Sequence, residues 1–314
     1  MKGGRLLWEV LILVCSIALF GCTEDESAKS RFKPKTGKIV IAPRFEEVNS
    51  FQEGLAAVRS GDLWGFIDKT GKYKITPQFY DARSFSGGLA AVRWENKWGY
   101  IDKTGKYTLT PQFILAEDFS EGLAAVKKGK RFGFIDTAGR FIIKPQFSGA
   151  GGFYEGLAAV NVGGLLGGKW GFIDKAGNFT IDPQFDLAGH FSEGLALVNM
   201  GGLIGGKWGF IDKTGQYVIS TQYDFAYSFH EGLAGVLLNG QAGFINKKGK
   251  FIFKPKYRSD GELSEGVIAV EIDDKWGFIN RKGKFVIQPQ FDEAWSFADG
   301  LAAVKIGKKW GFIE

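Results

Sequence analysis

Histidine, cysteine and acidic side chains carry most enzyme chemistry, and this sequence has few of them in a usable arrangement. Only two of the 314 residues are histidines, His190 and His230. Neither accompanies a cysteine nucleophile, a Gly-x-Ser-x-Gly elbow or a histidine-rich metal-binding spacing. Glycoside hydrolysis would need two facing carboxylates, and no segment carries a distinctive acidic insertion. We therefore expect no enzyme activity, no catalytic residue and no cofactor. A hydrolase whose site is hidden inside the fold is the enzymatic alternative.

Two glycine-rich segments look at first like phosphate-binding loops. Residues 163–169 read Gly-Gly-Leu-Leu-Gly-Gly-Lys, and residues 201–207 read Gly-Gly-Leu-Ile-Gly-Gly-Lys. A phosphate-binding loop continues with Ser or Thr and then a helix, whereas Trp170 and Trp208 follow here and no helix is expected. Each segment instead presents two aliphatic residues on a glycine frame, and exposed aliphatic residues often mark contact sites. The candidate partner-binding residues are Leu165, Leu166, Leu203 and Ile204. A recent duplication without function is an equal alternative.

The two cysteines, Cys15 and Cys22, both lie near the N-terminus. Residues 1–21 begin with Lys2 and Arg5 and continue with an apolar stretch too short to span a bilayer, which predicts a secretory leader. Cys22 would then be the only cysteine of the mature chain. An internal disulfide and a multi-thiolate zinc site are thereby excluded, and no metal site is expected.

The end of the leader, Leu-Phe-Gly-Cys at 19–22, resembles the bacterial lipobox. The resemblance implies a lipoprotein that is cleaved before Cys22 and acylated on that residue, which is the expected lipid-attachment site. Several acyl chains give stable membrane anchoring. Residues 22–35 are polar and predict a flexible tether. We expect the protein in the cell envelope, and in the outer membrane if the host has two membranes.

The basic residues are spread along the chain rather than clustered. The formal net charge is +6 and the sequence pI is about 9.1, but no long cationic run is present. Nucleic acid is therefore not an expected partner.

From residue 36 onward, one unit of about 34 residues recurs eight times. The dipeptide Trp-Gly appears in six units, and Phe132-Gly133 and Ala242-Gly243 stand in its place in the other two. Tight turns separate short apolar strands in each unit, which predicts an all-β domain. The expected units are 36–69, 70–103, 104–137, 138–175, 176–213, 214–247, 248–281 and 282–314, which together form the domain 36–314.

These units resemble WG (KWG) repeats, whose signature is carried by Pro-Gln-Phe at 77–79, Phe-Ser-Glu-Gly-Leu-Ala-Ala-Val at 119–126 and Lys-Trp-Gly-Phe-Ile-Asp at 169–174. The resemblance covers residues 36–314. It implies a β-rich repeat platform whose biochemical role is largely undefined.

The two ends of the domain are complementary. The first short strand, at 38–41, has no Trp-Gly strand before it, and the last Trp-Gly strand, at 309–313, has no short strand after it. Pairing the two would remove two exposed strand edges. The pattern therefore favours a β-propeller-like ring of eight units. An open β-superhelix is the alternative.

The repeated residues are expected to build the fold. The glycine before Leu-Ala-Ala-Val, present in all eight units, predicts a positive φ or a close backbone approach. The repeated tryptophans are expected to pack between repeats, and the acidic residue before that glycine is interpreted as a solvated turn residue. The favoured function is a non-catalytic protein–protein interaction platform. Binding of a glycan or cell-wall polymer is the alternative, and it predicts a regular row of exposed tryptophans.

Overall fold

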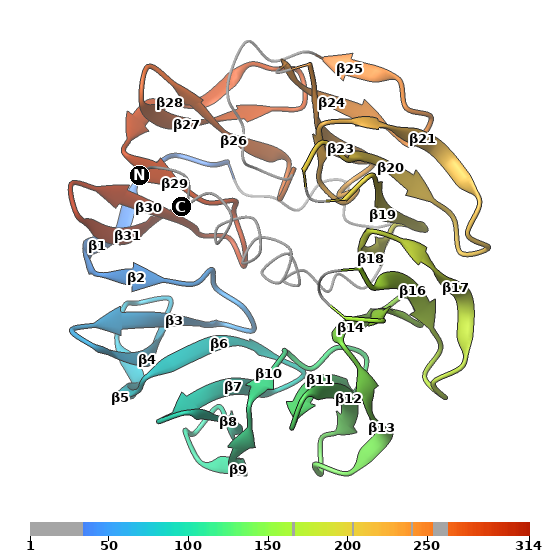
Figure 1. Ribbon diagram of the computed structural model, residues 1–314. Helices are drawn as coiled ribbons and strands as arrows, with labels where there is room; N and C mark the ends of the chain where they lie inside the picture. Colours follow the sequence, from blue (N-terminus) through green and yellow to red (C-terminus); the bar gives the residue numbers. More distant parts are fainter. Residues whose placement is uncertain (1–33, 165–166, 203, 240, 254–262) are drawn as a thin grey trace, which may run out of the picture.

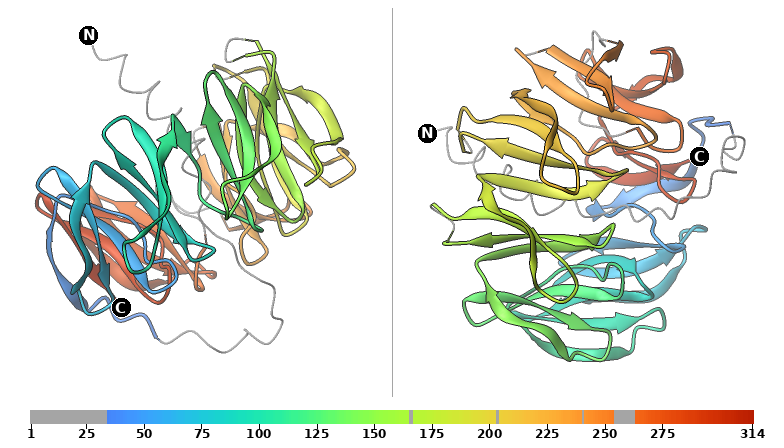
Figure 2. Two further views of the ribbon diagram at one scale, coloured as in Figure 1. Left: turned by 90° about the horizontal axis from the view of Figure 1, so that it is seen from below. Right: turned by 90° about the vertical axis from the view of Figure 1, so that its right-hand side faces the viewer.

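The computed structural model describes residues 34–164, 167–202, 204–239, 241–253 and 263–314. Eight antiparallel sheets, here called blades 1 to 8, stand around a common axis (Figure 1; edge-on views in Figure 2). The predicted all-β ring of eight repeated units is confirmed, and the open superhelix is wrong. No helix in the described ranges is long and apolar enough to cross a membrane.

Blades 1 to 4 are each built from four strands that follow one another in the sequence from the ring axis outward. Their strands are, in blade 1, β2 (Glu47–Val48), β3 (Leu55–Ser60), β4 (Leu63–Asp68) and β5 (Tyr73–Phe79); in blade 2, β6 (Asp81–Ser86), β7 (Leu89–Trp94), β8 (Lys97–Asp102) and β9 (Tyr107–Phe113); in blade 3, β10 (Leu115–Ala116), β11 (Leu123–Lys128), β12 (Arg131–Asp136) and β13 (Phe141–Phe147); and in blade 4, β14 (Gly149–Tyr154), β15 (Leu157–Val162), β16 (Lys169–Ile173) and β17 (Phe179–Phe185).

Blades 5 to 8 follow the same order, except that blade 8 takes its outermost strand from the start of the chain. Their strands are, in blade 5, β18 (Leu187–Ser192), β19 (Leu195–Met200), β20 (Lys207–Ile211) and β21 (Tyr217–Tyr223); in blade 6, β22 (Phe225–Ala226), β23 (Leu233–Leu238), β24 (Gln241–Asn246) and β25 (Phe251–Phe253); in blade 7, among the described residues, β26 (Val267–Ile272), β27 (Lys275–Asn280) and β28 (Phe285–Phe291); and in blade 8, β29 (Glu293–Ala294), β30 (Ala302–Ile306), β31 (Lys309–Ile313) and β1 (Ile39–Phe45).

The two faces of the ring carry different turns because neighbouring strands run antiparallel. Turns between the second and third strands of every blade lie on one face, which we call the insertion face because it carries segments 163–169 and 201–207. The opposite face carries the other two kinds of turn and is called the belt face. It holds the turns between the first and second strands and those between the third and fourth.

The hydrophobic core lies between blades rather than inside them. One cluster joins Trp64, Phe66 and Phe79 of blade 1 to Phe85 and Ile101 of blade 2. Alternating side chains of a strand point to opposite faces of its sheet, so each blade contributes apolar residues to both neighbours. A single blade therefore cannot bury its apolar surface alone, and the repeats stabilise one another.

The glycine of the Trp-Gly pair allows the outermost strand to pass very close. A Cβ atom on Gly65 would lie 2.6 Å from the carbonyl oxygen of Ile75 and 2.7 Å from the nitrogen of Pro77. The register between β4 and β5 shifts at this point: Trp64 pairs with Phe79, whereas Phe66 pairs with Ile75. The Pro-Gln-Phe segment therefore bulges over the glycine, which explains why the two signatures occur together.

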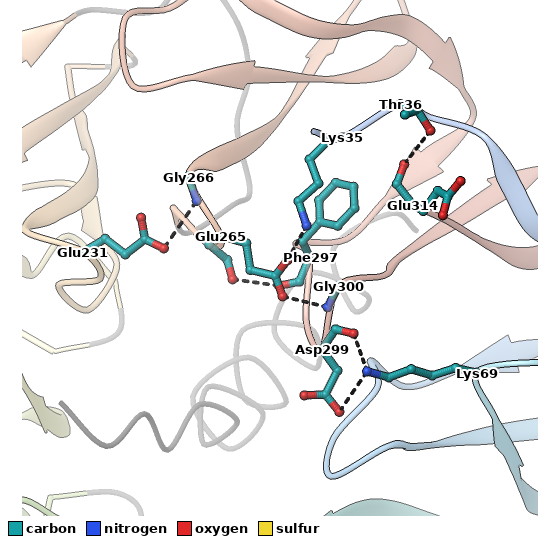
Figure 3. Close-up of polar contacts among 11 residues, drawn as sticks. Lys35, Thr36, Lys69, Glu231, Glu265, Gly266, Phe297, Asp299, Gly300 and Glu314 are labelled. Atoms are coloured by element: carbon teal, nitrogen blue, oxygen red, sulfur yellow. Dashed lines mark hydrogen bonds and ion pairs between the residues drawn. The ribbon is translucent and has the colours of Figure 1, made fainter. Parts of the chain in front are cut away.

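The ring closes through a turn that is divided between the two ends of the chain. Strand β1 pairs antiparallel with β31, and a core cluster joins Phe45 and Phe312 to residues of blade 1. The N–H groups of Thr36 and Gly37 donate to the carbonyl oxygen of Glu314 at 3.0 and 2.9 Å. The Thr36 hydroxyl donates to the same oxygen at 3.3 Å (Figure 3). In the continuous turn of blade 1, the N–H of Gly71 donates in the same way to the main-chain carbonyl oxygen of Asp68 at 2.8 Å. The seam thus reproduces the internal hairpins without a covalent link.

Candidate functional site

The sequence-predicted site residues lie partly outside the described part of the structure. Cys22, Leu165, Leu166 and Leu203 fall outside the described residues. Ile204 belongs to the second insertion and is 85% exposed. The two insertions occupy equivalent turns of blades 4 and 5, which are neighbours in the ring (Figure 1).

Exposed apolar residues gather on the insertion face over four successive blades. Trp94 lies at the end of β7 with 46% of its surface exposed, and its ring lies 5.8 Å from that of Tyr80. The arc continues over blades 3, 4 and 5. Its members are Tyr80, Trp94, Ile114, Leu115, Val162, Met200 and Ile204. The corresponding turn of blade 7 carries Asp273 and Asp274 instead, and that of blade 8 carries Lys308 beside Ile306, which is 43% exposed.

The repeated tryptophans do not form an exposed row. Five of them are only 5–8% exposed, and Trp170 is partly buried against its cluster. Phe132 takes the same buried place in blade 3. The prediction that the tryptophans pack between repeats is confirmed, so they offer no regular aromatic surface for a glycan.

The acidic turn residues link neighbouring blades and are more than solvated turn residues. Glu53 and Gly54 have φ values of 52° and 83°, as a tight two-residue hairpin turn requires, which confirms the expected positive φ of this glycine. The Glu53 carboxylate accepts a hydrogen bond from the N–H of Gly88 in blade 2, and Lys103 of blade 2 lies 3.1 Å from it. We call the series of such links on the belt face the carboxylate belt. Its acidic members are Glu53, Glu121, Glu155, Glu193, Glu231, Glu265 and Asp299.

The carboxylate belt continues across the seam. Asp299 of blade 8 accepts from the N–H of Gly54 in blade 1 at 2.8 Å and contacts Lys69 (Figure 3). Lys35 stands where an internal blade has the lysine that follows its third strand. It forms an ion pair with Glu265, and its Nζ lies 4.2 Å above the ring of Phe297. Only 7% of the Lys35 side chain is exposed, so this is a well-shielded link of the belt.

The belt lacks one link, between blades 2 and 3, where both the acidic residue and the lysine are replaced. Gly87 occupies the acidic position of blade 2, and Thr137 occupies the lysine position of blade 3. We expect the double variant Gly87→Glu/Thr137→Lys to show a favourable coupling energy of about 0.5 kcal/mol in a double-mutant cycle, because exposed ion pairs are worth this little. Urea unfolding of both single variants and the double variant measures it. Strict additivity would show that the link does not form.

A β-bulge in the innermost strand of blades 1 to 6 and 8 positions a different set of side chains. In blade 2, Ala82 faces Val92 and Phe85 faces Ala90, so the inner strand has one extra residue. Bulges redirect side chains and are frequent near functional sites. The small residue and the phenylalanine that flank the bulge recur, but the two residues between them vary. These bulge pairs are Asn49-Ser50, Arg83-Ser84, Glu117-Asp118, Gly151-Gly152, Gly189-His190, Tyr227-Ser228 and Trp295-Ser296.

The bulge pairs of blades 2 and 3 bring three charges together, at the blade interface where the belt is interrupted. Two nitrogens of the Arg83 guanidinium contact the two carboxylate oxygens of Glu117 at 2.9 and 3.1 Å. Arg83 also lies over the ring of Trp98. Asp118 is only 6% exposed, and neither of its carboxylate oxygens has a hydrogen-bond partner among the described residues. Burial raises its pKa to about 7, opposed by the charge of Arg83 and assisted by that of Glu117.

Aromatic and imidazole groups continue the inner surface over blades 4 to 6. The Tyr154 ring lies 4.4 Å from that of His190, and Gly152 makes room for it, since a Cβ there would lie 3.2 Å from the tyrosine ring. Burial raises the pKa of Tyr154, and the nearby charges of Asp118 and Glu117 add to the effect. Burial lowers the pKa of His190 to about 4, and the charge of His230 contributes. Both groups are therefore neutral at pH 7.

The raised pKa of Asp118 predicts a pH-dependent stability difference. The folded state binds more protons than the unfolded state between pH 3.8 and about 7, so the contribution of Asp118 to stability falls as the pH rises through this window. We expect Asp118→Asn to raise the Tm above pH 7, with the gain disappearing towards pH 4. The charged and titratable neighbours Arg83, Glu117, Tyr100 and Tyr154 are unchanged in the variant. Thermal unfolding of both proteins from pH 4 to pH 9 measures the difference. A constant or inverted difference would contradict the prediction.

Sequence reasoning missed this cluster because it searched the residues that recur. Glu117 and Asp118 were not recognised as a carboxylate pair, since they are neither an insertion nor part of a motif. The sequence feature that could have indicated them is a pair of polar residues at the two variable positions of the recurring Ala-x-x-Phe segment. Among the described residues, no group of three or more His, Cys, Asp or Glu side chains could hold a metal ion.

Several solved structures are similar to this chain at low sequence identity. The crystal structure of a eukaryotic initiation factor is similar over 86% of this chain and 83% of its own, at 12% identity and a TM-score of 0.56. Hsv2 of Kluyveromyces lactis (10% identity, 86% of this chain and 97% of its own) and the β-propeller domain of the Trilobed protease from Pyrococcus furiosus (13%, 78% and 99%) each have a TM-score of 0.49. No curated protein matches the sequence.

The repeats themselves match a known family model, described as "WG containing repeat". It matches eight times, over residues 35–64, 64–98, 98–131, 132–165, 170–203, 208–241, 243–276 and 276–310. Each match runs approximately from one Trp-Gly position to the next, so it combines strands of two neighbouring blades. Because these matches cover most of the chain, the protein belongs to the family of WG-containing repeat proteins.

Proposed function

We propose that this protein is a non-catalytic envelope lipoprotein whose propeller is a platform for protein–protein interaction. The lipid would be attached at Cys22, in the outer membrane of a host with two membranes. The insertion face would form the contact surface. The supporting observation is the apolar arc over blades 2 to 5, which includes Ile204 of the second glycine-rich insertion. Apolar patches of this kind on soluble domains mark interaction sites.

The residues that recur in every repeat and the residues that vary between repeats have different roles, which supports the same proposal. The repeated Trp, Phe and Gly residues pack between blades, and the repeated acidic residues form the carboxylate belt. These residues are engaged in building the ring. Specificity for a partner must therefore come from residues that differ between repeats, and the insertion face carries such residues in Trp94, Val162, Met200 and Ile204.

The experiment compares two faces of the same ring. The full chain, purified in mild detergent, is immobilised and exposed to envelope extract from its host. One variant replaces Trp94, Val162, Met200 and Ile204 by Ser. A matched variant replaces exposed apolar residues of the outermost strands, Phe179, Tyr217 and Val218, by Ser. A third replaces Leu165, Leu166, Leu203 and Ile204 by Ser, which tests the insertions alone.

We expect a protein partner to be retained by the wild type and by the outer-strand variant, and lost by the insertion-face variant. Retention by all variants would place the interface elsewhere and overturn the assignment of the insertion face. Retention of glycan or cell-wall material in place of protein would overturn the platform itself.

A further inference from the structure

Asp118 is a buried carboxylate without a donor. Its side chain lies on the innermost part of blade 3 and is more than nine-tenths buried, and both of its oxygens lack a hydrogen bond from any described residue. Buried polar groups are nearly always paired, because an unpaired one retains its desolvation cost. The equivalent bulge residue of blade 2, Ser84, has a buried hydroxyl that likewise lacks a partner among the described residues. Two neighbouring blades thus present unsatisfied polar atoms from equivalent positions.

Of the donors around Asp118, the two terminal nitrogens of Arg83 and the hydroxyls of Tyr100 and Ser120 bond to other groups. The guanidinium of Arg83 contacts both oxygens of Glu117 and the face of Trp98. The Tyr100 hydroxyl donates to the main-chain carbonyl of Glu117 at 2.6 Å, and the Ser120 hydroxyl donates to that of Phe153 at 2.5 Å. These contacts hold Glu117 in place, and none of them supplies a hydrogen bond to the carboxylate of Asp118.

The charge balance indicates what that group is. Arg83 carries one positive charge, and Glu117 and Asp118 carry two negative charges when ionised, so the cluster has a net charge of −1. A cation with several N–H donors would balance this charge and supply the missing hydrogen bonds, and charge-assisted hydrogen bonds are the strong ones. The Arg83 side chain remains 25% exposed, and Tyr154 and His190 are also partly exposed. The cluster thus meets solvent at Arg83, whereas the carboxylate oxygens of Asp118 are covered.

We propose that the inner bulges of blades 2 and 3 form a binding site for an ammonium or guanidinium group, with Asp118 as the charge partner, Ser84 as a further hydrogen-bonding group and the Arg83–Glu117 pair as the support that orients them. On the proposed platform such a group would be a lysine or arginine side chain of the partner. Arg83 and Glu117 act as positioning residues. The site is independent of the insertion face, because its residues lie in the inner bulges of blades 2 and 3. Its binding is measured with small probes and without a partner protein.

The test uses isothermal titration calorimetry on the full chain in mild detergent. The probes are N-acetyl-lysine methylamide and N-acetyl-arginine methylamide, and the uncharged N-acetyl-norleucine methylamide is the control probe. We expect the two cationic probes to bind and the norleucine probe not to bind. Asp118→Asn should weaken binding at least tenfold. The control Asp182→Asn removes an exposed carboxylate from the outermost strand β17 and should leave binding unchanged.

The pH dependence of binding separates a charge partner from a structural residue. A cation binds the ionised carboxylate, so affinity should fall about tenfold from pH 8 to pH 6, with uptake of a proton on release of the probe. Ser84→Ala should weaken binding less than Asp118→Asn while preserving this pH profile. Equal binding of the norleucine probe, unchanged binding by Asp118→Asn, or no binding by any probe would each overturn the site. Because no partner protein is present, failure here would leave the result on the insertion face intact.

Discussion

A methyl group added to the Trp-Gly glycine of blade 2 should destabilise the protein by about 3 kcal/mol or more. In Gly99→Ala, the new Cβ atom would lie 2.5 Å from the carbonyl oxygen of Leu109 and 2.7 Å from the nitrogen of Pro111. Both neighbours are backbone atoms of the outermost strand, so no side-chain rotation can relieve the contact. That strand would have to separate from β8. Urea unfolding of the variant and the wild type measures the loss.

Gly151→Ala is the matched control for this substitution. A Cβ atom at Gly151 would meet a single neighbouring atom, the carbonyl oxygen of Ala159 at 3.9 Å. We expect a change within about 0.5 kcal/mol, as for substitutions that touch no special feature. A similar loss in both variants would mean that the close approach of the outermost strand does not explain the repeated glycine, since the entropy change of Gly→Ala by itself favours the folded state.

Removing the Phe45 side chain at the seam should cost about 3–5 kcal/mol, as large-to-small substitutions of buried phenylalanine do. Phe45 is 2% exposed, and its ring packs edge-on against Tyr73 of blade 1 at 6.4 Å. The loss is expected because the cluster around Phe45 joins strands from both ends of the chain. The midpoint and the slope of a urea titration of Phe45→Ala measure it.

Phe79→Ala makes the same change at an interface where the chain is continuous. Phe79 is also 2% exposed and packs edge-on against Tyr107 at 6.3 Å. Equal losses with equal slopes are expected if the seam unfolds together with the other blades. A much smaller loss for Phe45→Ala would show that the ring opens at the seam before the blades unfold.

The sequence favoured the ring through its complementary ends, whereas the recurrence of the repeat alone fits an open superhelix equally well. Unmatched strands at 38–41 and 309–313 indicated closure, and the turn shared by Glu314 and Thr36 is the local structure that achieves it. The recurrent tryptophans also predicted their own burial, since a residue needed once per blade is one that fills the space between blades. These inferences hold because each one depends on a pattern repeated around the ring.

The inner cluster could not be predicted in this way, because its chemistry arises from what does not recur. Arg83 and Glu117 are 34 residues apart and meet only because blades 2 and 3 place equivalent bulges next to each other. The missing donor of Asp118 is likewise a property of its surroundings, invisible in the sequence. The carboxylate belt was misread for a related reason. A recurring acidic residue next to a turn glycine looks solvated until the next blade is placed beside it.

The divided turn at the seam makes the start of the chain an arbitrary point on a circle. Glu314 and Lys35-Thr36-Gly37 together supply what one continuous segment supplies elsewhere, as in Asp68 to Gly71. A peptide bond between Glu314 and Lys35 with new termini in another such turn would preserve every strand pairing in the ring. The fold therefore does not depend on which of these equivalent turns is divided. The seam places Lys35 on the belt face, so the tether of the proposed lipoprotein would join the ring on the face opposite the insertions.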